Sequence, residues 1–515
     1  MSGPNGAASR PQTPTQTPSP ADIPSPVFPS PEQPLFPPRQ PLQPPQPFSP
    51  LPPLSLYVHI PWCVRKCPYC DFNSHGQRQP LPEADYVAAL TADLDAALPD
   101  IAGREIVSIF FGGGTPSLFS GHAIDAMLTA IRARMPLARD AEITLEANPG
   151  TAEAEKFTAF RAAGINRLSL GIQSFNPAHL QALGRIHDDG EARRAIEIAQ
   201  RHFNAINLDL MYGLPQQTLK QALADLGQAM RYAPAHLSCY QLAIEPNTAF
   251  AARPPALDAD LAADMQEAIE KRLAAAGYLH YETSAFALPG RSCRHNLNYW
   301  TFGDYLGIGA GAHSKLTRVP DICANPRADT DANTDANTGA NTCNDSRADA
   351  PSRQFLPSGA PAGNASLSAG AQKNPLRVFR QVRWAQPGRY MTQAAAGHAC
   401  QETWNVDDSE LPGEFMMNAL RLNQGFDAAL FSQHTGLPLT CIKAPLQQAV
   451  AEGLIEWRAA PTPSDLNAPA AQTRPAGPSD SAIPARPGHA GVSRFIAPTP
   501  LGRRFLNRLL ALFLP

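Results

Sequence analysis

The chain of 515 residues is long enough for two or more domains, each with its own hydrophobic core. Its net charge of -3 and isoelectric point near 6.5 give no electrostatic footprint for nucleic acid, and no apolar run reaches the length of a membrane span. The nine cysteines are odd in number, and three of them are clustered, which is not the pattern of a disulfide framework. We therefore expect the protein to reside in the reducing cytoplasm.

The first 53 residues are dominated by proline together with Ser, Gln and Thr. Such a composition buries little apolar surface and builds neither a helix nor a sheet ladder, which predicts a disordered tail at 1–53. The tail lacks a basic segment followed by an apolar run, so we do not expect a secretory signal. A proline-recognising partner is one use for it, and an extension without a binding role is the alternative.

Three cysteines, Cys63, Cys67 and Cys70, fall within eight residues directly after a short run of strand-forming residues. Thiolates that converge on one loop are ligands for a soft metal centre. Three sulfurs leave one position open, either on a tetrahedral zinc ion or on a [4Fe–4S] cluster. The sequence favours the cluster. A zinc knuckle completed by His59 or His75, or three unrelated buried cysteines, are the alternatives.

From residue 54 to about 287, short strand-like runs alternate with Ala-rich amphipathic stretches. The predicted strands are 55–60, 106–111, 142–147, 167–172, 205–211, 236–244 and 280–284. The predicted helices are 83–98, 123–134, 152–162, 192–202, 219–231 and 257–275. This alternation predicts an α/β fold whose parallel sheet closes fully or partly into a barrel. In such folds the chemistry gathers at the carboxyl ends of the strands.

Glycines and polar residues follow several of these strands, at 112–116, 146–150, 171–175 and 209–215. Glycines let backbone N–H groups approach a carboxylate or a phosphate, although a tight strand-to-helix corner has the same sequence. Each polar residue alone is also explained by capping or by a core hydrogen bond. Their recurrence at successive strand ends favours a shared ligand pocket.

A set of ordered motifs resembles a known family. The motifs are the cysteine loop and the segments 112–116, 146–149, 171–175, 183–185 and 209–215. Together they resemble the radical S-adenosylmethionine proteins of the coproporphyrinogen-oxidase-like group, and within that group its heme chaperones. The resemblance covers essentially everything outside the tail and the inserts. It implies a partial, six-stranded (β/α) barrel that holds a [4Fe–4S] cluster on Cys63, Cys67 and Cys70.

The resemblance also implies that the open iron binds the amino and carboxylate groups of S-adenosylmethionine. The residues expected to contact this cofactor are Tyr57, Tyr69, Gly113, Gly114, Thr115, Glu146, Gln173, Arg185 and Asp209. Their chemistry suits the ligand, because carboxylates and an amide bond ammonium and hydroxyl groups, and a guanidinium grips a carboxylate. Reduction of the cluster would break a sulfonium bond of the cofactor, while the protein supplies placement and excludes water.

The segment 293–300, Cys-Arg-His-Asn-Leu-Asn-Tyr-Trp, resembles the signature that the heme chaperones associate with heme. Imidazole is a common axial ligand of heme iron, and aromatic faces stack on a porphyrin. The resemblance therefore makes His295, Tyr299 and Trp300 candidate heme contacts, with Cys293 and His313 as alternatives. A packed loop, in which His295 bonds backbone and Trp300 fills the barrel mouth, is the structural interpretation.

Two further stretches are expected to be disordered. Asp, Asn, Thr, Ala and Ser dominate the composition from 317 to 375, and 459–493 is rich in Pro, Ala and Ser. The first insert lacks the fixed glycine and the glutamate of a calcium loop, and its Cys323 and Cys343 are not expected to be ligands. Around the second insert, 376–515 is expected to hold a strand that extends the barrel sheet and a small C-terminal domain.

That C-terminal domain resembles the helical, winged-helix-like domain of the heme chaperones. Its predicted helices are 410–420, 428–435, 439–452 and 500–514, and its predicted strands are 454–457 and 494–497. A winged helix often binds DNA, but the isoelectric point argues against it. The basic and apolar final helix is interpreted as a closing helix of the core, with peripheral membrane contact as the alternative.

The leading functional hypothesis is a cytoplasmic carrier that binds heme and S-adenosylmethionine on a cluster-bearing barrel and passes heme to an apo-hemoprotein, such as a respiratory one. The alternative is an oxygen-independent coproporphyrinogen III dehydrogenase, which decarboxylates propionates. The oxidases carry a further cysteine two residues after the third cluster ligand, where this chain has Asp71 and Phe72. This difference favours the carrier. A radical enzyme with another substrate is a third possibility.

Overall fold

The computed structural model describes residues 51–514 apart from 78, 102, 152, 320–375 and 460–493. The predicted tail up to residue 50 and nearly all of both predicted inserts, with Cys323 and Cys343, lie outside the described residues. The expected start of the first insert at residue 317 falls inside a strand, because β12 (His313–Arg318) continues past it. The predicted domain limits stay a prediction.

Twelve strands form one mixed sheet in the order β14-β13-β12-β11-β1-β4-β5-β6-β7-β8-β10-β9. They are β1 (Leu54–Ile60), β4 (Ile106–Gly113), β5 (Leu137–Ala147), β6 (Arg167–Gln173), β7 (Ile206–Tyr212), β8 (His236–Gln241), β9 (Leu279–Glu282), β10 (Ala285–Ala287), β11 (Asp304–Ile308), β12, β13 (Arg377–Arg383) and β14 (Cys400–Asn405). The strands β1, β4, β5, β6, β7 and β8 are parallel neighbours in chain order. This confirms the predicted α/β fold with a six-stranded partial barrel. Within the described residues the barrel is open, since β14 and β9 are the two ends of the sheet.

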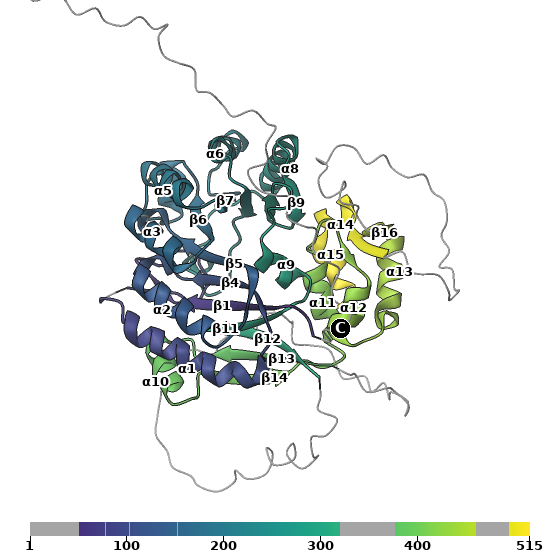
Figure 1. Ribbon diagram of the computed structural model, residues 1–515. Helices are drawn as coiled ribbons and strands as arrows, with labels where there is room; N and C mark the ends of the chain where they lie inside the picture. The colour runs from purple at the N-terminus through teal and green to yellow at the C-terminus, as the bar shows by residue number, and fades with distance from the viewer. Residues whose placement is uncertain are drawn as a thin grey trace, which may run out of the picture. The chain divides into compact units, whose positions relative to one another are not determined.

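Helices connect the parallel strands and line the outer side of the curved sheet (Figure 1). They are α1 (Glu83–Ile101), α2 (Gly121–Arg132), α3 (Ala154–Ala163), α4 (Pro177–Ala182), α5 (Asp189–His202), α6 (Leu219–Arg231), α7 (Ala249–Ala252) and α8 (Ala259–Ala275). Local sequence explains where two of them begin. Capping boxes, in which a side chain at the N-cap and one three residues later bond each other's backbone, start α5 at Asp188 and α6 at Thr218.

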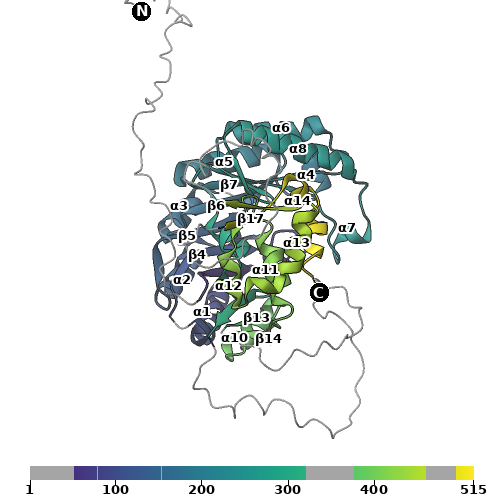
Figure 2. The ribbon, with the colours of Figure 1, turned by 90° about the vertical axis from the view of Figure 1, so that its right-hand side faces the viewer.

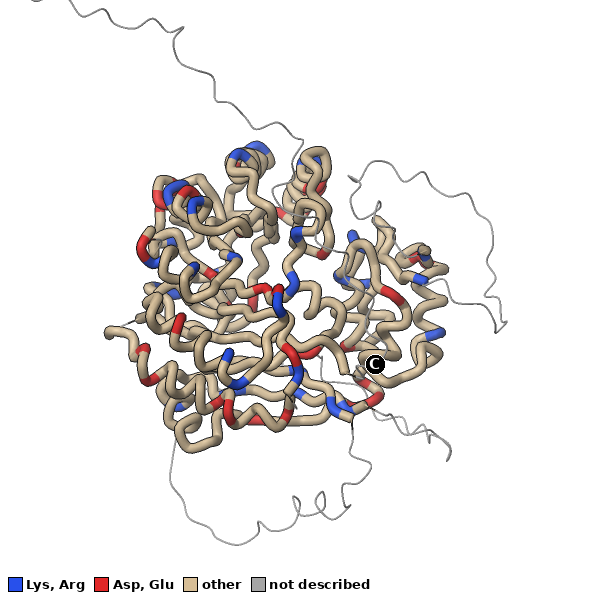
Figure 3. The backbone as a smooth tube through the Cα atoms, in the orientation of Figure 1, with Lys and Arg blue, Asp and Glu red and all other residues tan. Residues whose placement is uncertain are grey.

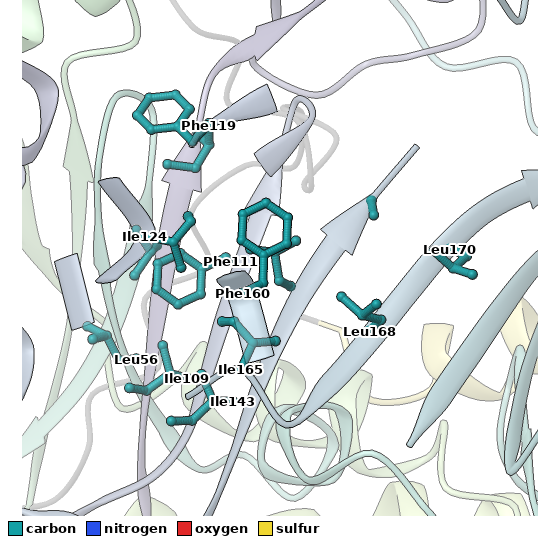
Figure 4. Close-up of a cluster of buried hydrophobic side chains, with 14 of the residues drawn as sticks. Leu56, Ile109, Phe111, Phe119, Ile124, Ile143, Phe160, Ile165, Leu168 and Leu170 are labelled. Carbon is teal, nitrogen blue, oxygen red and sulfur yellow. The ribbon is translucent and has the colours of Figure 1, made fainter. Parts of the chain in front are cut away.

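The outer face of the parallel strands forms the main hydrophobic core (Figure 4). Leu56, Ile109, Ile143 and Leu168 come from four neighbouring strands, and Phe160 comes from α3. Side chains alternate between the two faces of a strand, so every second residue of these strands reaches the helices. Burying each such side chain stabilises the fold by about 1.5–3 kcal/mol.

The edges of the sheet differ from the prediction. The strand predicted at 280–284 is β9, but it runs antiparallel to β10, which itself runs antiparallel to β8. A parallel connection needs a crossover of a dozen or more residues, and the link between β9 and β10 is far too short. At the other edge, β13 pairs with β12 and confirms the predicted strand that extends the barrel sheet after the first insert. The prediction contained no counterpart of β11, β12, β14 or α10 (Pro387–Ala395).

The C-terminal elements match the predicted winged-helix-like arrangement (Figure 2). Helices α11 (Leu411–Ala419), α12 (Ala429–Thr435) and α13 (Lys443–Ala451) pack with a three-stranded sheet of order β15-β17-β16. These strands are β15 (Phe426–Asp427), β17 (Arg494–Pro498) and β16 (Ile455–Ala459). The predicted closing helix is divided into α14 (Pro500–Arg504) and α15 (Leu506–Ala511), and α15 buries Leu509 in the local core.

Acidic and basic residues are interspersed along the described chain in Figure 3. Among the described helices, none combines the length and the hydropathy that crossing a bilayer requires.

Candidate functional site

The cysteine loop is attached to the carboxyl end of β1. Its two ends form the short parallel strands β2 (Trp62–Cys63) and β3 (His75–Gly76). The backbone N–H of His75 donates to the carbonyl of Pro61 at 2.7 Å. The N–H of Gln77 donates to the carbonyl of Cys63 at 2.7 Å. These bonds close the base of the loop, and the loop follows β1 as the sequence predicted from the strand before the cysteines.

Cys63, Cys67 and Cys70 are free, half-buried thiols of this loop. Burial is the main cause that raises the pKa of Cys63 and of Cys70, and the neighbouring cysteines raise both further. A metal centre reverses this preference, because a coordinating thiol is deprotonated outright. The hydroxyl of Thr115 donates to Cys63 Sγ at 3.5 Å, and a guanidinium nitrogen of Arg185 lies 3.8 Å from Cys67 Sγ. Donors aimed at two of the three sulfurs suit thiolates, so the loop fits an iron–sulfur cluster.

The zinc alternative fits poorly. Both ring nitrogens of His59 are engaged, Nε2 with the carbonyl of Asn73 at 2.8 Å and Nδ1 with the hydroxyl of Tyr57 at 3.0 Å. His75 bonds the Asn73 side chain through Nε2 at 3.2 Å. In the described part of the chain, no three His, Cys, Asp or Glu side chains are grouped tightly enough for a single metal ion. A cluster instead spreads its cysteine ligands over several irons.

The glycine segment after β4 packs directly against the cysteine loop. Gly114 N–H donates to the carbonyl of Ile60 and Thr115 N–H to that of Trp62, both at 2.7 Å. A Cβ on Gly114 would lie 2.5 Å from the Trp62 carbonyl oxygen, and one on Gly113 would lie 2.5 Å from the His59 ring. Gly113 also has a positive φ of 111°. The close approach of the two segments is therefore sufficient to explain both glycines.

A hollow beside the loop brings several predicted residues together. Cys67, Thr115 and Arg185 line it, together with Asn148 from the end of β5. Arg185 donates to the carbonyl of Gly171 at 2.8 Å, while its buried Nε bonds no described residue. A cation with a spare donor next to the thiols suits a carboxylate ligand. S-adenosylmethionine carries such a carboxylate, so the donors of this site match the chemistry of that group.

The two predicted acidic residues lie on neighbouring parts of the inner face. Burial, with Asp209 as the next cause, raises the pKa of Glu146 to about 8. Asp209 accepts hydrogen bonds from Asn207 at 2.7 Å and from Ser169 at 3.0 Å. Burial also raises the pKa of Asp209. Two acids that repel each other inside a barrel favour a ligand that brings positive charge.

Gln173 and Tyr69 complete the predicted cofactor set. Gln173 ends β6 with a positive φ of 66°, and its side-chain carbonyl accepts from the hydroxyl of Tyr240 at 2.6 Å. Tyr69, between the second and third cysteines, packs against a small apolar cluster around Leu183 and Met211. Tyr57 lies on the inner face of β1 and bonds His59. Gln173 thus lies at a strand end, Tyr57 in the middle of β1 and Tyr69 in the cysteine loop itself.

The predicted heme segment is a short helix rather than a loop. Helix α9 (Arg294–Trp300) contacts β1, β4 and β11 on the side of the sheet away from the outer helices (Figure 1). The ring of His295 stacks on Phe110 with 4.6 Å between ring centroids, and on Tyr57 at 6.3 Å. Burial lowers the pKa of His295 to about 4, so its imidazole is neutral near pH 7. Neither ring nitrogen bonds a described residue, and Nδ1 is buried.

The other candidate heme residues differ in position. Tyr299 stacks on Tyr305 at 4.3 Å and lies 5.8 Å from His295, whereas Trp300 packs edge-on against Tyr299. Cys293 is buried, and its thiol donates to Glu142 at 3.3 Å. His313 is exposed on β12. The geometry thus groups His295 and Tyr299 with Tyr57 of the predicted cofactor set, and leaves His313 apart.

Sequence reasoning missed a polar network on the inner face of the parallel strands. His236 bonds the side chain of Asn207 at 2.6 Å and the hydroxyl of Tyr281 at 2.8 Å, and Glu142 accepts the N–H of Arg294 at 3.0 Å. The available signal was the alternation itself. Polar residues occupy every second position of several strands, at 142, 144 and 146, at 167 and 169, at 207 and 209, and at 236 and 238. In a strand buried on both faces, this pattern indicates a lined interior.

Comparisons with known proteins agree with this geometry. Residues 57–227 match the model of the radical SAM superfamily, and 406–459 match that of the HemN C-terminal domain. The chain is 44% identical over 407 residues to the heme chaperone HemW of Escherichia coli, covering 79% of this chain and 92% of that protein. It is 43% identical over 411 residues to the heme chaperone HemW of Haemophilus influenzae, with 79% and 92% covered. Among solved structures, coproporphyrinogen III oxidase (HemN) of Escherichia coli aligns with a TM-score of 0.62 at 20% identity over 90% of both chains, a likeness of fold alone.

Proposed function

The chain belongs to the HemW family of radical S-adenosylmethionine proteins, and from that premise we propose that it is a heme carrier. It binds heme, a [4Fe–4S] cluster and S-adenosylmethionine, and it transfers heme to an apo-hemoprotein. The relatives that cover most of the chain are named heme chaperones, which supports a carrier rather than an oxidase.

One observation carries the proposal. His295 has a neutral imidazole whose ring nitrogens bond no described residue, and it stacks on Phe110 and Tyr57 with the tilted ring of Tyr299 beside it. A free imidazole nitrogen can ligate heme iron, and flanking aromatic rings can stack on the porphyrin. His295 is only partly buried, whereas the fully buried His236 bonds its surroundings through both ring nitrogens.

The cysteine loop would hold the cluster on Cys63, Cys67 and Cys70. When bound, the cluster supplies a one-electron centre beside S-adenosylmethionine. The chain itself would hold the cluster and the cofactor in place. Arg185 would bind the cofactor carboxylate, and the hydroxyl of Thr115 would donate to the sulfur of the ligand Cys63.

The remaining residues of the cofactor set would orient S-adenosylmethionine across the strand ends. Glu146 and Asp209 offer carboxylates to its positive and hydroxyl groups, and Gln173 offers an amide. Tyr57 and Tyr69 would flank it, with the backbone of Gly113 and Gly114 next to its methionine end. Tyr57 also stacks on His295, so the cofactor and the heme would be neighbours on one inner face.

The alternative, an oxidase, is disfavoured by one position. The oxidases have a further cysteine where this chain carries Phe72, whose side chain is 60% exposed at the loop surface. An exposed phenylalanine neither binds metal nor transfers a proton. It leaves the chain without the extra thiol that the oxidases use there.

Hemin titration of cluster-reconstituted protein tests the proposal. We expect tight binding with a shifted Soret band, and a loss of affinity of about tenfold or more in His295→Ala. His122→Ala, on the exposed side of α2, is the matched control and should bind as the wild type does. An unshifted Soret band, or unaltered binding in His295→Ala, would remove the proposed heme role.

A second pair of assays separates carrier from enzyme. Hemin-loaded protein mixed with an apo-hemoprotein should lose its own Soret signal as the acceptor gains one. The same protein, given coproporphyrinogen III, S-adenosylmethionine and a reductant, should produce no protoporphyrinogen. Sustained production would overturn the carrier in favour of the oxidase.

A further inference from the structure

An arginine on the inner face has no partner that explains its burial. Arg167, the first residue of β6, is 5% exposed. None of its side-chain nitrogens donates a hydrogen bond to a described residue, and no described carboxylate oxygen lies within 4.0 Å of them. Two other buried cations show the usual arrangement, since Lys315 pairs with Asp304 at 2.9 Å and Arg383 with Asp93 at 3.1 Å. A buried charge without a partner is costly and needs an explanation.

The acids around Arg167 are committed to other groups. Glu142 accepts from the Cys293 thiol and the Arg294 N–H, and Asp209 accepts from two side chains of the network described above. Both carboxylates raise the pKa of Arg167 at longer range, although burial opposes them. The guanidinium therefore keeps its charge and its donors free on the inner face.

The register of the sheet relates Arg167 to the proposed heme stack. Tyr57 pairs with Phe110, Phe110 with Thr144, and Thr144 with Arg167. Paired residues of parallel strands project to the same side, so these four side chains form one row. Phe110 and Arg167 are two strand spacings apart, about 10 Å between their backbones. Arg167 also lowers the pKa of His295, which agrees with two groups that face the same interior.

We infer that Arg167 receives a carboxylate of the ligand bound on this inner face, and that in the proposed function this carboxylate is a propionate of heme. The planar guanidinium presents parallel N–H donors that match a carboxylate, and a low-dielectric surrounding strengthens the pair. With the iron next to His295, a propionate would be directed along this row toward Arg167. This inference rests on the proposed function and adds the group that orients the heme.

Comparing hemin with hemin dimethyl ester tests this role, because the ester keeps the iron and the ring but removes the carboxylates. We expect the cluster-reconstituted wild type to bind hemin about 10- to 100-fold more tightly than the ester. In Arg167→Met this preference should fall to within about twofold, and Arg167→Lys should keep part of it because it retains the charge. Arg231→Met, on the exposed side of α6, should keep the full preference.

The controls separate the possible failures. S-adenosylmethionine affinity and cluster content should be unchanged in Arg167→Met. Equal binding of hemin and ester by the wild type, which needs no variant to fold, would overturn the role of Arg167 while leaving heme binding intact. Loss of S-adenosylmethionine affinity in Arg167→Met with an unchanged preference for hemin would overturn it as well. Failure of the wild type to bind hemin at all would overturn the proposed function, and this inference with it.

Discussion

The two faces of the six parallel strands differ in composition and in role. On β4, Phe111 points outward and is fully buried among the helices, whereas the preceding Phe110 points inward and stacks on His295. The outer face is apolar from strand to strand (Figure 4). The inner face carries hydroxyls, amides, acids and Arg167 at every second position. Stability is therefore concentrated on the outer face, and the inner face is free to hold polar groups that a ligand can use.

The largest expected effect is on stability, and it comes from truncating a side chain of the outer face. Phe111→Ala should lower the free energy of unfolding by about 3–5 kcal/mol, because it removes a fully buried ring and leaves a cavity. Phe110→Ala should cost less than half as much, since its ring is only half-buried. Denaturant unfolding followed by circular dichroism measures both. Equal losses in the two variants would mean that the inner face contributes as much packing as the outer face.

The raised pKa of an acid on the inner face should make the stability of the protein depend on pH. Burial raises the pKa of Glu146 to about 8 from its ordinary value of 4.5, so the folded protein keeps a proton that the unfolded chain releases. That stabilisation is complete below pH 4.5 and is lost as the pH rises through 8. In Glu146→Gln, the fall in the free energy of unfolding with rising pH should be smaller by about 1–3 kcal/mol. Unfolding curves measured between pH 5 and 8.5 give this difference. Glu155→Gln, on α3, should show no such difference. An unchanged decline in Glu146→Gln would contradict a protonated Glu146.

A third change separates binding from folding. Asp209→Asn should weaken S-adenosylmethionine binding by about 10- to 100-fold, because a charged acceptor on the inner face is lost. Its stability should hold or increase, since burial disfavours this carboxylate in the free protein. Isothermal titration of the cluster-reconstituted protein gives the affinity. A stability loss without an affinity loss would make Asp209 a structural residue.

The smallest expected effect concerns a hydroxyl without a partner. Thr144 Oγ1 is buried on the inner face and bonds no described residue. Thr144→Val should leave stability unchanged or raise it by up to about 1 kcal/mol. The contrast is Ser174→Ala, which removes a hydroxyl that donates to Asp225 at 2.6 Å and should cost about 1 kcal/mol. A clear loss in Thr144→Val would point to a bound water or ligand that uses the hydroxyl.

The alternation of strands and helices was sufficient to predict the parallel sheet. Apolar periodicity and caps such as Asp188 are local signals, so the positions of the six parallel strands and of most helices followed from the sequence. The cysteine spacing likewise predicted one loop with three thiols. The antiparallel strand β10 between β8 and β9 was not predicted, because it depends on a link to β9 that is too short for a crossover, a restriction that the prediction of strands did not use.

Helix α9 could not be predicted from its own residues. Cys293, which precedes the helix, makes no side-chain cap. The first two N–H groups of the helix instead donate to the carboxylate of Glu142 on β5. A helix whose start is satisfied by a distant strand leaves no local signature. The row from Tyr57 to Arg167 is similar, because it depends on the register between strands. Polar alternation was visible in the sequence, but which residues lie side by side was not.

The adjacent phenylalanines of β4 provide the most direct test that one face binds and the other folds. Hemin titrations of Phe110→Ala and Phe111→Ala, under conditions in which both remain folded, compare the two faces at neighbouring positions. We expect Phe110→Ala to weaken hemin binding by about tenfold while Phe111→Ala binds as the wild type does. Wild-type affinity in Phe110→Ala, together with weakened binding in Phe111→Ala, would contradict the assignment of ligand binding to the inner face.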